Sequence, residues 1–293
     1  MTEFKYLKTN TMQSADEFLS LVGDDLLSDE IRHGLIYGIA EKVSEDENVF
    51  GAGKPWFILM EGQGRNCAAA IRTPPHRVIL AHLFGDLKQV STELVRAVHK
   101  ADPYIPGVIG DVEIVEPFTR QWCAVYGVEV RESVAQRIYQ LTELVEPTYA
   151  EGHLRRANLD DQEIVVEWAA AFHEEALGDV FPREHYKRYR QRILDGDIFL
   201  WDDGSPVSMA AQTRPTQRGV SVGLVYTPPE KRNQGYATSC VAALSKHLLH
   251  QFEFCTLYTD LSNPTSNSIY MQIGYKAYSD SVQYTFSAPK MSD

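Results

Sequence analysis

VGLVYTPPEKRNQGYATSCVAALSKHLL, residues 222–249, runs from an apolar strand through a Pro-Pro break and a short basic loop into an amphipathic helix. A loop that opens a helix presents several backbone N–H groups that have no partner within the helix. The helix dipole adds about half a positive charge at the same end. The stretch therefore predicts a strand, a turn, and a helix whose N-terminus binds an anion.

Three residues of this loop suit a phosphate ligand. Gly235 lets the backbone approach a ligand closely, and Ala237 keeps the next turn small. Arg232 adds a fixed positive charge whose planar guanidinium fits phosphate oxygens. Together these residues favour a pyrophosphate as the bound group.

Two other kinds of phosphate loop do not fit the sequence. There is no G-x-x-x-x-G-K-[ST] segment, so the sequence does not indicate a P-loop NTPase. The pair Gly62-Gln63-Gly64 has Cys67 where a dinucleotide-binding loop needs a small third residue, and strand-like sequence follows it. We expect a hairpin turn there.

Residues 232–237, Arg-Asn-Gln-Gly-Tyr-Ala, fit the pattern R/Q-x-x-G-x-G/A. This segment resembles the acetyl-coenzyme A signature of the GCN5-related N-acetyltransferase (GNAT) family, which also follows a strand and opens a helix. Residues 263–275, NPTSNSIYMQIGY, are similar to the family's closing segment N-x-x-[SA]-x-x-[LI]-Y-x-x-x-G-[FY]. The resemblance covers roughly the last 140 residues, and the first half in outline only.

The resemblance implies where acetyl-coenzyme A, the acyl donor, would bind. Its pantetheine arm would pair with the strand ending near residue 226, its diphosphate would bind the loop 232–238, and the closing helix would supply two asparagines. The cofactor-binding residues predicted in this way are Leu224, Val225, Tyr226, Thr227, Arg232, Asn233, Gln234, Gly235, Tyr236, Ala237, Thr238, Asn263 and Asn267. Asn263 is equally suited to capping its helix, and Thr238 to bonding the preceding turn.

Tyr270 matches the family tyrosine that stands near the coenzyme sulfur, so the resemblance implies that it is the general acid. A phenol has an ordinary pKa near 10, so it stays protonated at neutral pH and can still give its proton to a thiolate. The alternative is that Tyr270 only packs its helix, with its hydroxyl on solvent or on a backbone carbonyl.

The general base is not evident from the sequence. The strand 220–226 carries no carboxylate, although family members often place one there. His173, Glu174 and Glu175 lie where acceptors usually enter, but the run HEEALGD is more typical of a solvated helix end. Proton loss through water is the other possibility.

Hydrophobic spacing and turn residues predict the same order of elements in both halves. In the first half, helices are expected within 13–45 and at 86–101 and 112–126, with strands at 56–61, 66–72, 77–83, 107–110 and 128–144. In the second half, strands are expected at 153–157, 198–201, 207–213 and 220–226, with helices from 159 and at about 184–194. The second half then ends with the two family-like segments.

We therefore predict an α+β protein with two tandem acyl-coenzyme A N-acyltransferase-like domains, each a mostly antiparallel mixed sheet flanked by helices. Proline, glycine and polar residues at 146–152 place the boundary, giving domains 1–147 and 148–293. In the first half, the turn His82-Leu83-Phe84-Gly85-Asp86 lacks the signature. Asp86 can cap the helix that follows, and its carboxylate would repel a pyrophosphate. The first domain is expected to be a degenerate copy without a cofactor loop.

Composition excludes several classes of function. The chain has 40 acidic and 28 basic residues and a net charge of -12, which disfavours nucleic-acid binding. Its four cysteines form no C-x-x-C pair, so neither a disulfide nor a metal site is expected. The N-terminal residues lack a hydrophobic signal region, and no run approaches the ~20 apolar residues of a membrane span. We expect a cytoplasmic protein that binds no membrane.

The function implied by the resemblance is an acetyl-coenzyme A-dependent N-acetyltransferase, in which a primary amine attacks the thioester directly. A small-molecule amine is the expected acceptor, with peptide N-termini and lysines as the other acceptors left open. The oligomeric state is left between monomer and homodimer. Two alternatives stay open at this point. One is a non-catalytic sensor that holds acetyl-coenzyme A or coenzyme A, and the other is a transferase for a longer acyl group.

Overall fold

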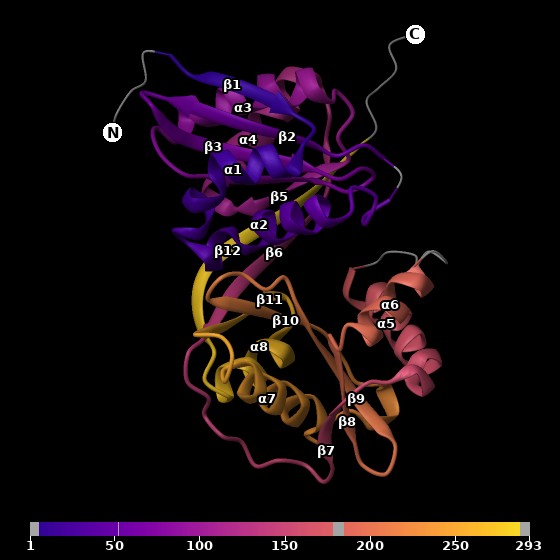
Figure 1. Cartoon of the computed structure of the whole chain (residues 1–293). Coiled ribbons are helices and arrows are strands. Elements are labelled where there is room, and N and C mark those ends of the chain that lie inside the picture. The colour runs from indigo at the N-terminus through magenta and orange to yellow at the C-terminus, as the bar shows by residue number, and fades with distance from the viewer. Residues whose placement is uncertain (1–5, 52, 178–184, 288–293) are drawn as a thin grey trace. The chain divides into compact units, whose positions relative to one another are not determined.

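The computed structural model describes residues 6–51, 53–177 and 185–287 of the chain (Figure 1). Strands and helices alternate along it, and the described part forms two compact units. One unit contains Met1–Ile138, Thr259–Ser262 and Tyr278–Asp293, and the other contains Tyr139–Tyr258 and Asn263–Ala277. Each compact unit is built from separate segments of the chain, whereas each predicted domain, 1–147 or 148–293, is one continuous segment. The division into these two functional domains stays a prediction.

The first half contains every predicted helix and strand. Its elements are β1 (Lys8–Met12), α1 (Ala15–Leu27), α2 (Glu30–Glu45), β2 (Trp56–Gly62), β3 (Arg65–Arg72), β4 (Val78–His82), α3 (Leu87–Ala101), β5 (Gly107–Asp111), α4 (Val112–Tyr126) and β6 (Val130–Leu141). Strand β1 was not predicted, because its sequence KTNTM is short and polar. It pairs antiparallel with β2 only, as an edge strand with little hydrophobic signal can.

The second half repeats this order. Its elements are β7 (His153–Arg156), the 3-10 helix η1 (Leu159–Asp161), α5 (Gln162–Leu177), α6 (His185–Leu194), β8 (Ile198–Asp202), β9 (Pro206–Thr213), β10 (Gly219–Tyr226), the 3-10 helix η2 (Pro229–Lys231), α7 (Tyr236–Leu248), β11 (Phe254–Asp260), α8 (Pro264–Gln272) and β12 (Lys276–Phe286). Apart from the 3-10 helices, both halves read β-α-α-β-β-β-α-β-α-β. The prediction of two copies of one fold is confirmed at this level. The predicted start of α6 at 184 lies outside the described residues.

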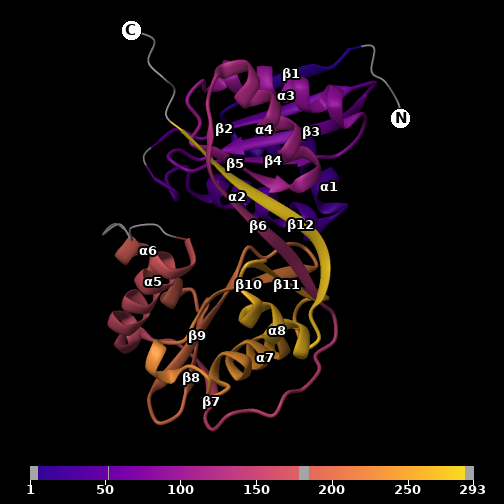
Figure 2. The ribbon, with the colours of Figure 1, turned by 180° about the vertical axis from the view of Figure 1, so that it is seen from behind.

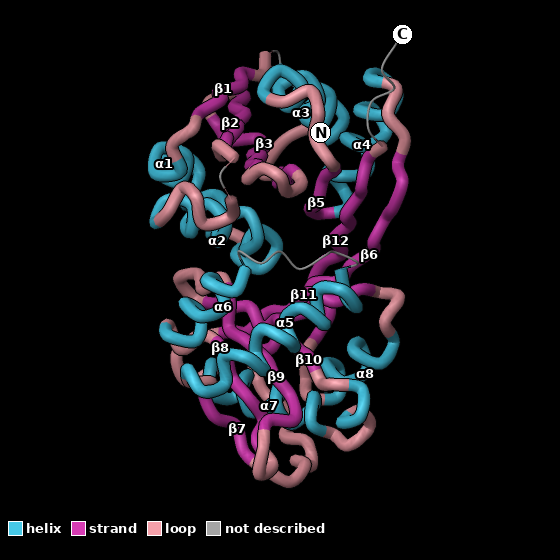
Figure 3. The backbone as a smooth tube through the Cα atoms, turned by 90° about the vertical axis from the view of Figure 1, so that its right-hand side faces the viewer, coloured by secondary structure: helices cyan, strands magenta, loops and turns pink. Residues whose placement is uncertain are grey.

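In the first unit, alternate residues of each strand pack on opposite faces of the sheet. On β2, Trp56, Ile58 and Met60 contact the core formed with α3 and α4. Phe57 and Leu59 contact the core formed with α1 and α2. Figure 3 shows these two helix pairs on either side of the strands. Because both faces are covered, the strands read as continuous apolar runs rather than as alternating ones.

The second unit has the same layers. Its core on one face joins α7 and α8 to β10 and β11, through residues such as Val241, Ile273 and Val222. The core on the other face joins α5 and α6 to the sheet, through residues such as Trp168 and Ile193. This arrangement leaves α7 directly after β10, as the sequence predicted, with its N-terminus at the end of that strand.

The last strand of the chain belongs to the first unit over most of its length. Residues Ser281–Thr285 of β12 pair antiparallel with Asp111–Gly107 of β5 (Figure 2). Gly107 has no side chain, and a Cβ built there would collide with the Tyr284 carbonyl oxygen. The close approach of the two backbones therefore requires glycine at this position.

Gly107→Ala is expected to lower the free energy of unfolding by about 2–3 kcal/mol, because the added methyl pushes β12 away from β5. Chemical denaturation followed by circular dichroism measures this loss. Gly34→Ala is the control, since a Cβ at that position in α2 meets no atom within 4 Å. It should stabilise the protein by about 0.5–1 kcal/mol. Equal stability of the Gly107→Ala variant and the parent would contradict the tight pairing.

Candidate functional site

The loop before α7 enters the left-handed backbone region twice, at Asn233 with φ 61° and at Gly235 with φ 80°. Gly235 is the N-cap residue of α7, and no side-chain hydrogen bond caps this helix in the part of the chain that the structure describes. The backbone N–H of Ser239 bonds to the Gly235 carbonyl at 2.9 Å, so the amides of residues 236–238 precede the first intrahelical bond. Such a turn forms a concave row of N–H groups suited to an anion.

Strand β10 carries a bulge directly before this loop. Its register against β9 shifts between Gly223 and Tyr226, so Leu224 and Val225 lie opposite one residue of β9. Leu224 has φ 52°, a conformation that a bulky side chain rarely adopts. The bulge takes backbone groups of this segment out of the β9 ladder and leaves them available to a ligand.

The other side of β10 opens at the same level. Over the described residues of both strands, β10 and β11 pair in parallel only between Gly219–Ser221 and Phe254–Thr256. Residues 222–226 have no partner on β11, so the two strands diverge there. An extended ligand can enter this opening and pair with β10 as an added strand would.

The charge of Arg232 is already engaged in the structure. Its Nη2 lies 2.7 Å from Glu175 Oε2, and its Nε donates to the Thr227 carbonyl at 2.9 Å. The Tyr226 hydroxyl also bonds to Glu175, at 3.4 Å. Burial, followed by the Glu175 charge, raises the pKa of Tyr226. Glu175 therefore lies against two of the predicted cofactor residues.

The two neighbours of Glu175 in the predicted acceptor region are placed differently. His173 Nε2 lies 3.3 Å from the Tyr189 hydroxyl of α6, and Glu174 is exposed. The last two residues of the run HEEALGD, 178 and 179, lie outside the described residues. Of the three candidate bases, Glu175 is the one that an ion pair joins to the signature loop.

Several contacts that the sequence did not indicate support the loop. Ser208, fully buried on β9, bonds to the Thr227 hydroxyl at 2.9 Å and to the Tyr226 carbonyl at 3.2 Å. The Tyr236 hydroxyl donates to Asp203 at 2.7 Å, and the Gln234 amide donates to the Glu230 carbonyl at 3.3 Å. Ala237 and Thr238 are half-buried at the start of α7. Ser208 and Asp203 are far from the loop in the sequence, so no local pattern indicates their contacts.

Helix α8 begins as predicted, with Asn263 as its cap. The Asn263 side chain accepts from the Ser266 backbone N–H at 3.1 Å, and Asn267 is buried one turn later. The capping interpretation of Asn263 is confirmed. A contact with coenzyme stays a prediction for both asparagines.

Tyr270 is buried in the core that α8 shares with α7, with 8% of its surface exposed. Its ring lies edge-on to Tyr275, with 6.1 Å between the ring centroids. Burial raises the pKa of Tyr270 to about 12, and a hydrogen bond with Ser266 acts in the opposite direction. The phenol is therefore held in its protonated form, as a general acid requires.

The first unit closes the corresponding positions with its own side chains. The Asp86 carboxylate caps α3 by accepting from the Gln89 backbone N–H at 3.0 Å. This helix start thus already holds a negative charge. The prediction that Asp86 caps a helix is confirmed, and α3 and α7 differ at their N-caps in the way that the degenerate-copy hypothesis requires.

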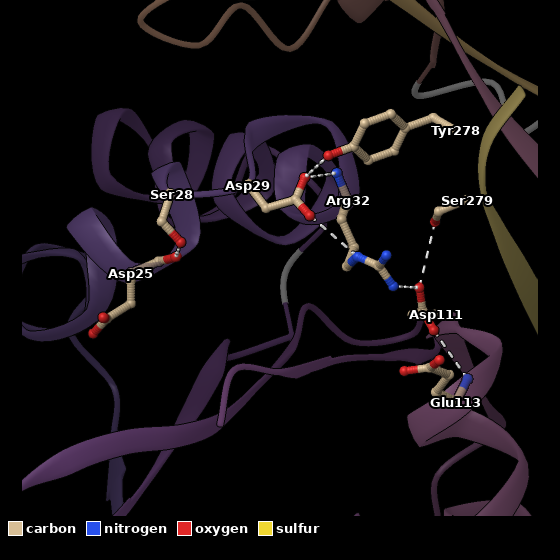
Figure 4. Close-up of polar contacts among 8 residues, drawn as sticks. All are labelled: Asp25, Ser28, Asp29, Arg32, Asp111, Glu113, Tyr278 and Ser279. Carbon is tan, nitrogen blue, oxygen red and sulfur yellow. Dashed lines mark hydrogen bonds and ion pairs between the residues drawn. The ribbon is translucent and has the colours of Figure 1, made fainter. Parts of the chain in front are cut away.

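The end of β5 is also occupied, by the polar network in Figure 4. Asp111 bonds to Arg32 and accepts from the Ser279 hydroxyl at 3.3 Å. Arg32 Nε donates to Asp29 at 3.2 Å, and Asp29 accepts from the Tyr278 hydroxyl at 2.9 Å. These charges satisfy one another, so this strand end is built as a closed structural contact.

Among the described residues, no group of three or more His, Cys, Asp or Glu side chains is placed to hold a metal ion. The four cysteines are free thiols. No helix of the described chain is long and apolar enough to cross a bilayer.

Several solved structures with a similar fold are described as acetyltransferases. The chain is similar to an acetyltransferase from the GNAT family from Colwellia psychrerythraea, with a TM-score of 0.61 and 16% identity over 96% of this chain and 100% of that chain. The chain is also similar to a GCN5-related N-acetyltransferase from Sphaerobacter thermophilus, with a TM-score of 0.63 and 15% sequence identity over 98% of each chain. A tandem GNAT protein from the clavulanic acid biosynthesis pathway has a TM-score of 0.55 and 12% sequence identity, over 98% of this chain and 100% of that chain. The protein thus has the GNAT fold in its tandem form.

One sequence family is matched as well. Residues 202–284, which include the bulge, the signature loop and α8, match the family model described as FR47-like protein. No curated protein matches the chain. The matched segment is the part of the second half in which the sequence placed the cofactor site.

Proposed function

We propose that the protein is an acetyl-coenzyme A-dependent N-acetyltransferase whose second half binds the acyl donor. The observation that carries this proposal is the difference between two equivalent helix starts. The N-terminus of α3 is closed by the Asp86 carboxylate, whereas α7 begins at Gly235 without a side-chain cap. Of these two helix starts, only that of α7 has no carboxylate to repel a diphosphate.

The residues that would hold the donor follow from the geometry. The amides of residues 235–238 and the side chain of Arg232 would bind its diphosphate. The bulged backbone of Leu224 and Val225 would pair with the pantetheine amides and polarise the thioester carbonyl. Asn263, Asn267 and the remaining loop residues Thr227, Asn233, Gln234 and Tyr236 would line the same path. Bound there, acetyl-coenzyme A supplies an acetyl group activated as a thioester.

The proposed reaction forms one bond, breaks another and transfers two protons. A neutral amine nitrogen forms a bond to the carbonyl carbon, the carbon–sulfur bond breaks, and the coenzyme leaves as a thiolate. Tyr270 gives its phenolic proton to this thiolate. The amine loses a proton, either to water or to a carboxylate such as Glu175. An amine that carries its own positive charge cannot attack, so the acceptor must be deprotonated before the bond forms.

A calorimetric titration with acetyl-coenzyme A, followed by a thiol-release assay over a panel of primary amines, tests the proposal. Binding with release of coenzyme A on at least one amine is the expected result. Binding without turnover on any amine would favour the non-catalytic sensor, and faster release from longer acyl donors would favour the longer-chain transferase. Absence of binding would refute the proposal.

Glu175→Gln is expected to tighten acetyl-coenzyme A binding roughly two- to five-fold, because it frees Arg232 from an exposed ion pair worth up to about 1 kcal/mol. Calorimetry measures the change. Glu174→Gln is the control, since it removes the same charge from the adjacent exposed position. A fall in turnover of about 100-fold with unchanged affinity would instead identify Glu175 as the base.

A further inference from the structure

Apart from the helix start of α7, the second unit contains a separate group of positive charges. Arg214 follows β9, and Arg188 and Arg192 lie on α6. Arg192 donates to the carbonyl of Gln212, two residues before Arg214, so these two side chains lie in one region of the fold. Burial lowers the pKa of Arg214, and the Arg192 charge acts in the same direction, whereas Tyr258 opposes it. Burial also lowers the pKa of Arg188, which lies one turn before Arg192 on α6. Like charges gather in this way at a cost, which an anionic ligand would remove.

Arg214 is the residue of this group whose charge is least compensated. Its Nε is buried and has no hydrogen-bond partner among the described residues. Its guanidinium carbon lies 5.6 Å from the centroid of the Tyr258 ring. Its backbone also adopts φ 48°, in the left-handed region. A buried donor on a permanent cation is costly unless an acceptor reaches it.

The positive charge of Arg192 is only weakly paired. Its Nη2 donates to the Gln212 carbonyl at 3.1 Å, and its Nε lies 4.0 Å from Asp197, at the limit of an ion pair. Its guanidinium also lies 5.7 Å from the centre of the Tyr189 ring. Nη2 therefore reaches β9, whereas Nε lies near the residue that precedes β8, so Arg192 makes one hydrogen bond and one long ion pair.

The position of Arg214 relative to the opening between β10 and β11 indicates which ligand would carry the anionic group. Ser221 and Thr256 bond through their hydroxyls at 2.7 Å, at the last paired position of β10 and β11. Tyr258 is two residues beyond Thr256 and so lies on the same face, at the beginning of the opening. Arg214 therefore reaches the opening where the strands diverge.

This face is the one covered by α5 and α6. On β10, Val220 and Val222 pack into the core with α7, so the intervening Ser221 faces the opposite side. Leu224 and Tyr226, beyond the bulge, pack into the core with α5 and α6. The donor's diphosphate site lies at the start of α7, whereas Arg214 faces the α5–α6 side of the opening. The two positive regions are therefore suited to two different ligands.

We propose that Arg214, with Arg192 beside it, binds an anionic group on the acceptor, so that the substrate is a primary amine that also carries a carboxylate or a phosphate. This inference rests on the proposed function, because it assigns the arginines to the second substrate of the same reaction. Guanidinium groups bind both anions through paired hydrogen bonds. The local charge thus selects against the simple cationic amines that the net charge of -12 favours.

The test is a thiol-release assay at saturating acetyl-coenzyme A with matched acceptor pairs. One series sets ω-amino carboxylates of increasing length beside their carboxamides, and the other sets phosphoethanolamine beside ethanolamine. The parent enzyme is expected to favour the anionic member of at least one series by 10-fold or more in kcat/KM. The series with the larger ratio distinguishes a carboxylate from a phosphate.

Arg214→Gln should remove this preference. We expect a loss of about 10- to 100-fold in kcat/KM for the anionic acceptor, mainly through KM, with little change for its neutral partner. Arg214→Lys, which keeps the positive charge but lacks the planar guanidinium with its paired donors, should recover part of the loss. Arg218→Gln is the control, because it removes an arginine from the same β9–β10 connection with its side chain 50% exposed.

The outcomes separate this inference from the proposed function. Release of coenzyme A with equal rates on anionic and neutral amines would overturn the inference alone, and that measurement needs only the parent enzyme. An equal loss on both members of a pair in Arg214→Gln would also overturn it. A chain that neither binds acetyl-coenzyme A nor releases thiol would refute the proposed function, and the inference with it.

Discussion

Gly235→Asp is expected to weaken acetyl-coenzyme A binding by about 100-fold or more. The substitution places a carboxylate at the N-cap of α7, where Asp86 lies in the first unit at the start of α3. A full charge about 4 Å from a diphosphate costs roughly 4 kcal/mol at the effective dielectric constant near a protein surface, and salt reduces this value. The side chain also competes for the amides that would bind the ligand. Calorimetric titration measures the change.

Gly235→Asn provides the matched control. Asparagine has nearly the same shape as aspartate, caps helices equally well, and tolerates a left-handed backbone such as φ 80° better than most residues. Among the described residues, a Cβ at this position would meet Ala150 Cβ alone, at an ordinary contact distance of 3.8 Å, so both variants should fold. We expect a much smaller loss of affinity for the asparagine variant. If both variants bind equally well, the anion site is not at this helix start.

Tyr270→Phe is expected to lower kcat by about 100-fold and to leave the affinity for acetyl-coenzyme A unchanged. The variant keeps the ring in the core and removes only the hydroxyl, which would protonate the leaving thiolate. The raised pKa of Tyr270, about 12, means that the phenol stays protonated up to high pH. Its ionisation should therefore cause no loss of rate between pH 7 and 10. Steady-state kinetics over that range measure both effects.

Tyr275→Phe is the control for Tyr270. Tyr275 is also buried in the α7–α8 core, and its hydroxyl bonds to Ser245 at 2.8 Å. Removing this hydroxyl should cost about 1 kcal/mol of stability without changing kcat. Unchanged turnover in Tyr270→Phe would remove the assignment of the general acid, and an equal loss in both variants would point to the core packing instead.

The order of elements was legible in the sequence because it depends on local signals. The pair Gly62-Gln63-Gly64 was expected to form a hairpin, and Gly62 does pair with Arg65, with Gln63 and Gly64 in the left-handed region. Asn263 caps α8 and Asp86 caps α3, as their positions before apolar runs indicated. Turns, caps and helical spacing involve residues within a few positions of one another, so the sequence displays them directly.

The candidate site was only partly legible. The strand, loop and helix of residues 222–249 determine by themselves a glycine-containing turn at a helix start, since glycine alone adopts such a backbone without strain. The sequence did not indicate that Glu175 pairs with Arg232, that Ser208 supports Thr227, or that β10 bulges at Leu224. These contacts join segments that are far apart in the chain.

The tertiary structure alone decided two further features. It paired β12 with β5, which places most of this strand in the first unit, and it brought Arg214 near Arg192 and Tyr258. Strand partners and the neighbours of a buried charge depend on contacts between residues that are far apart in the chain. Such contacts do not show in the local sequence around either residue. The sequence determined what each segment can form, and the packed fold determined which charges it must hold together.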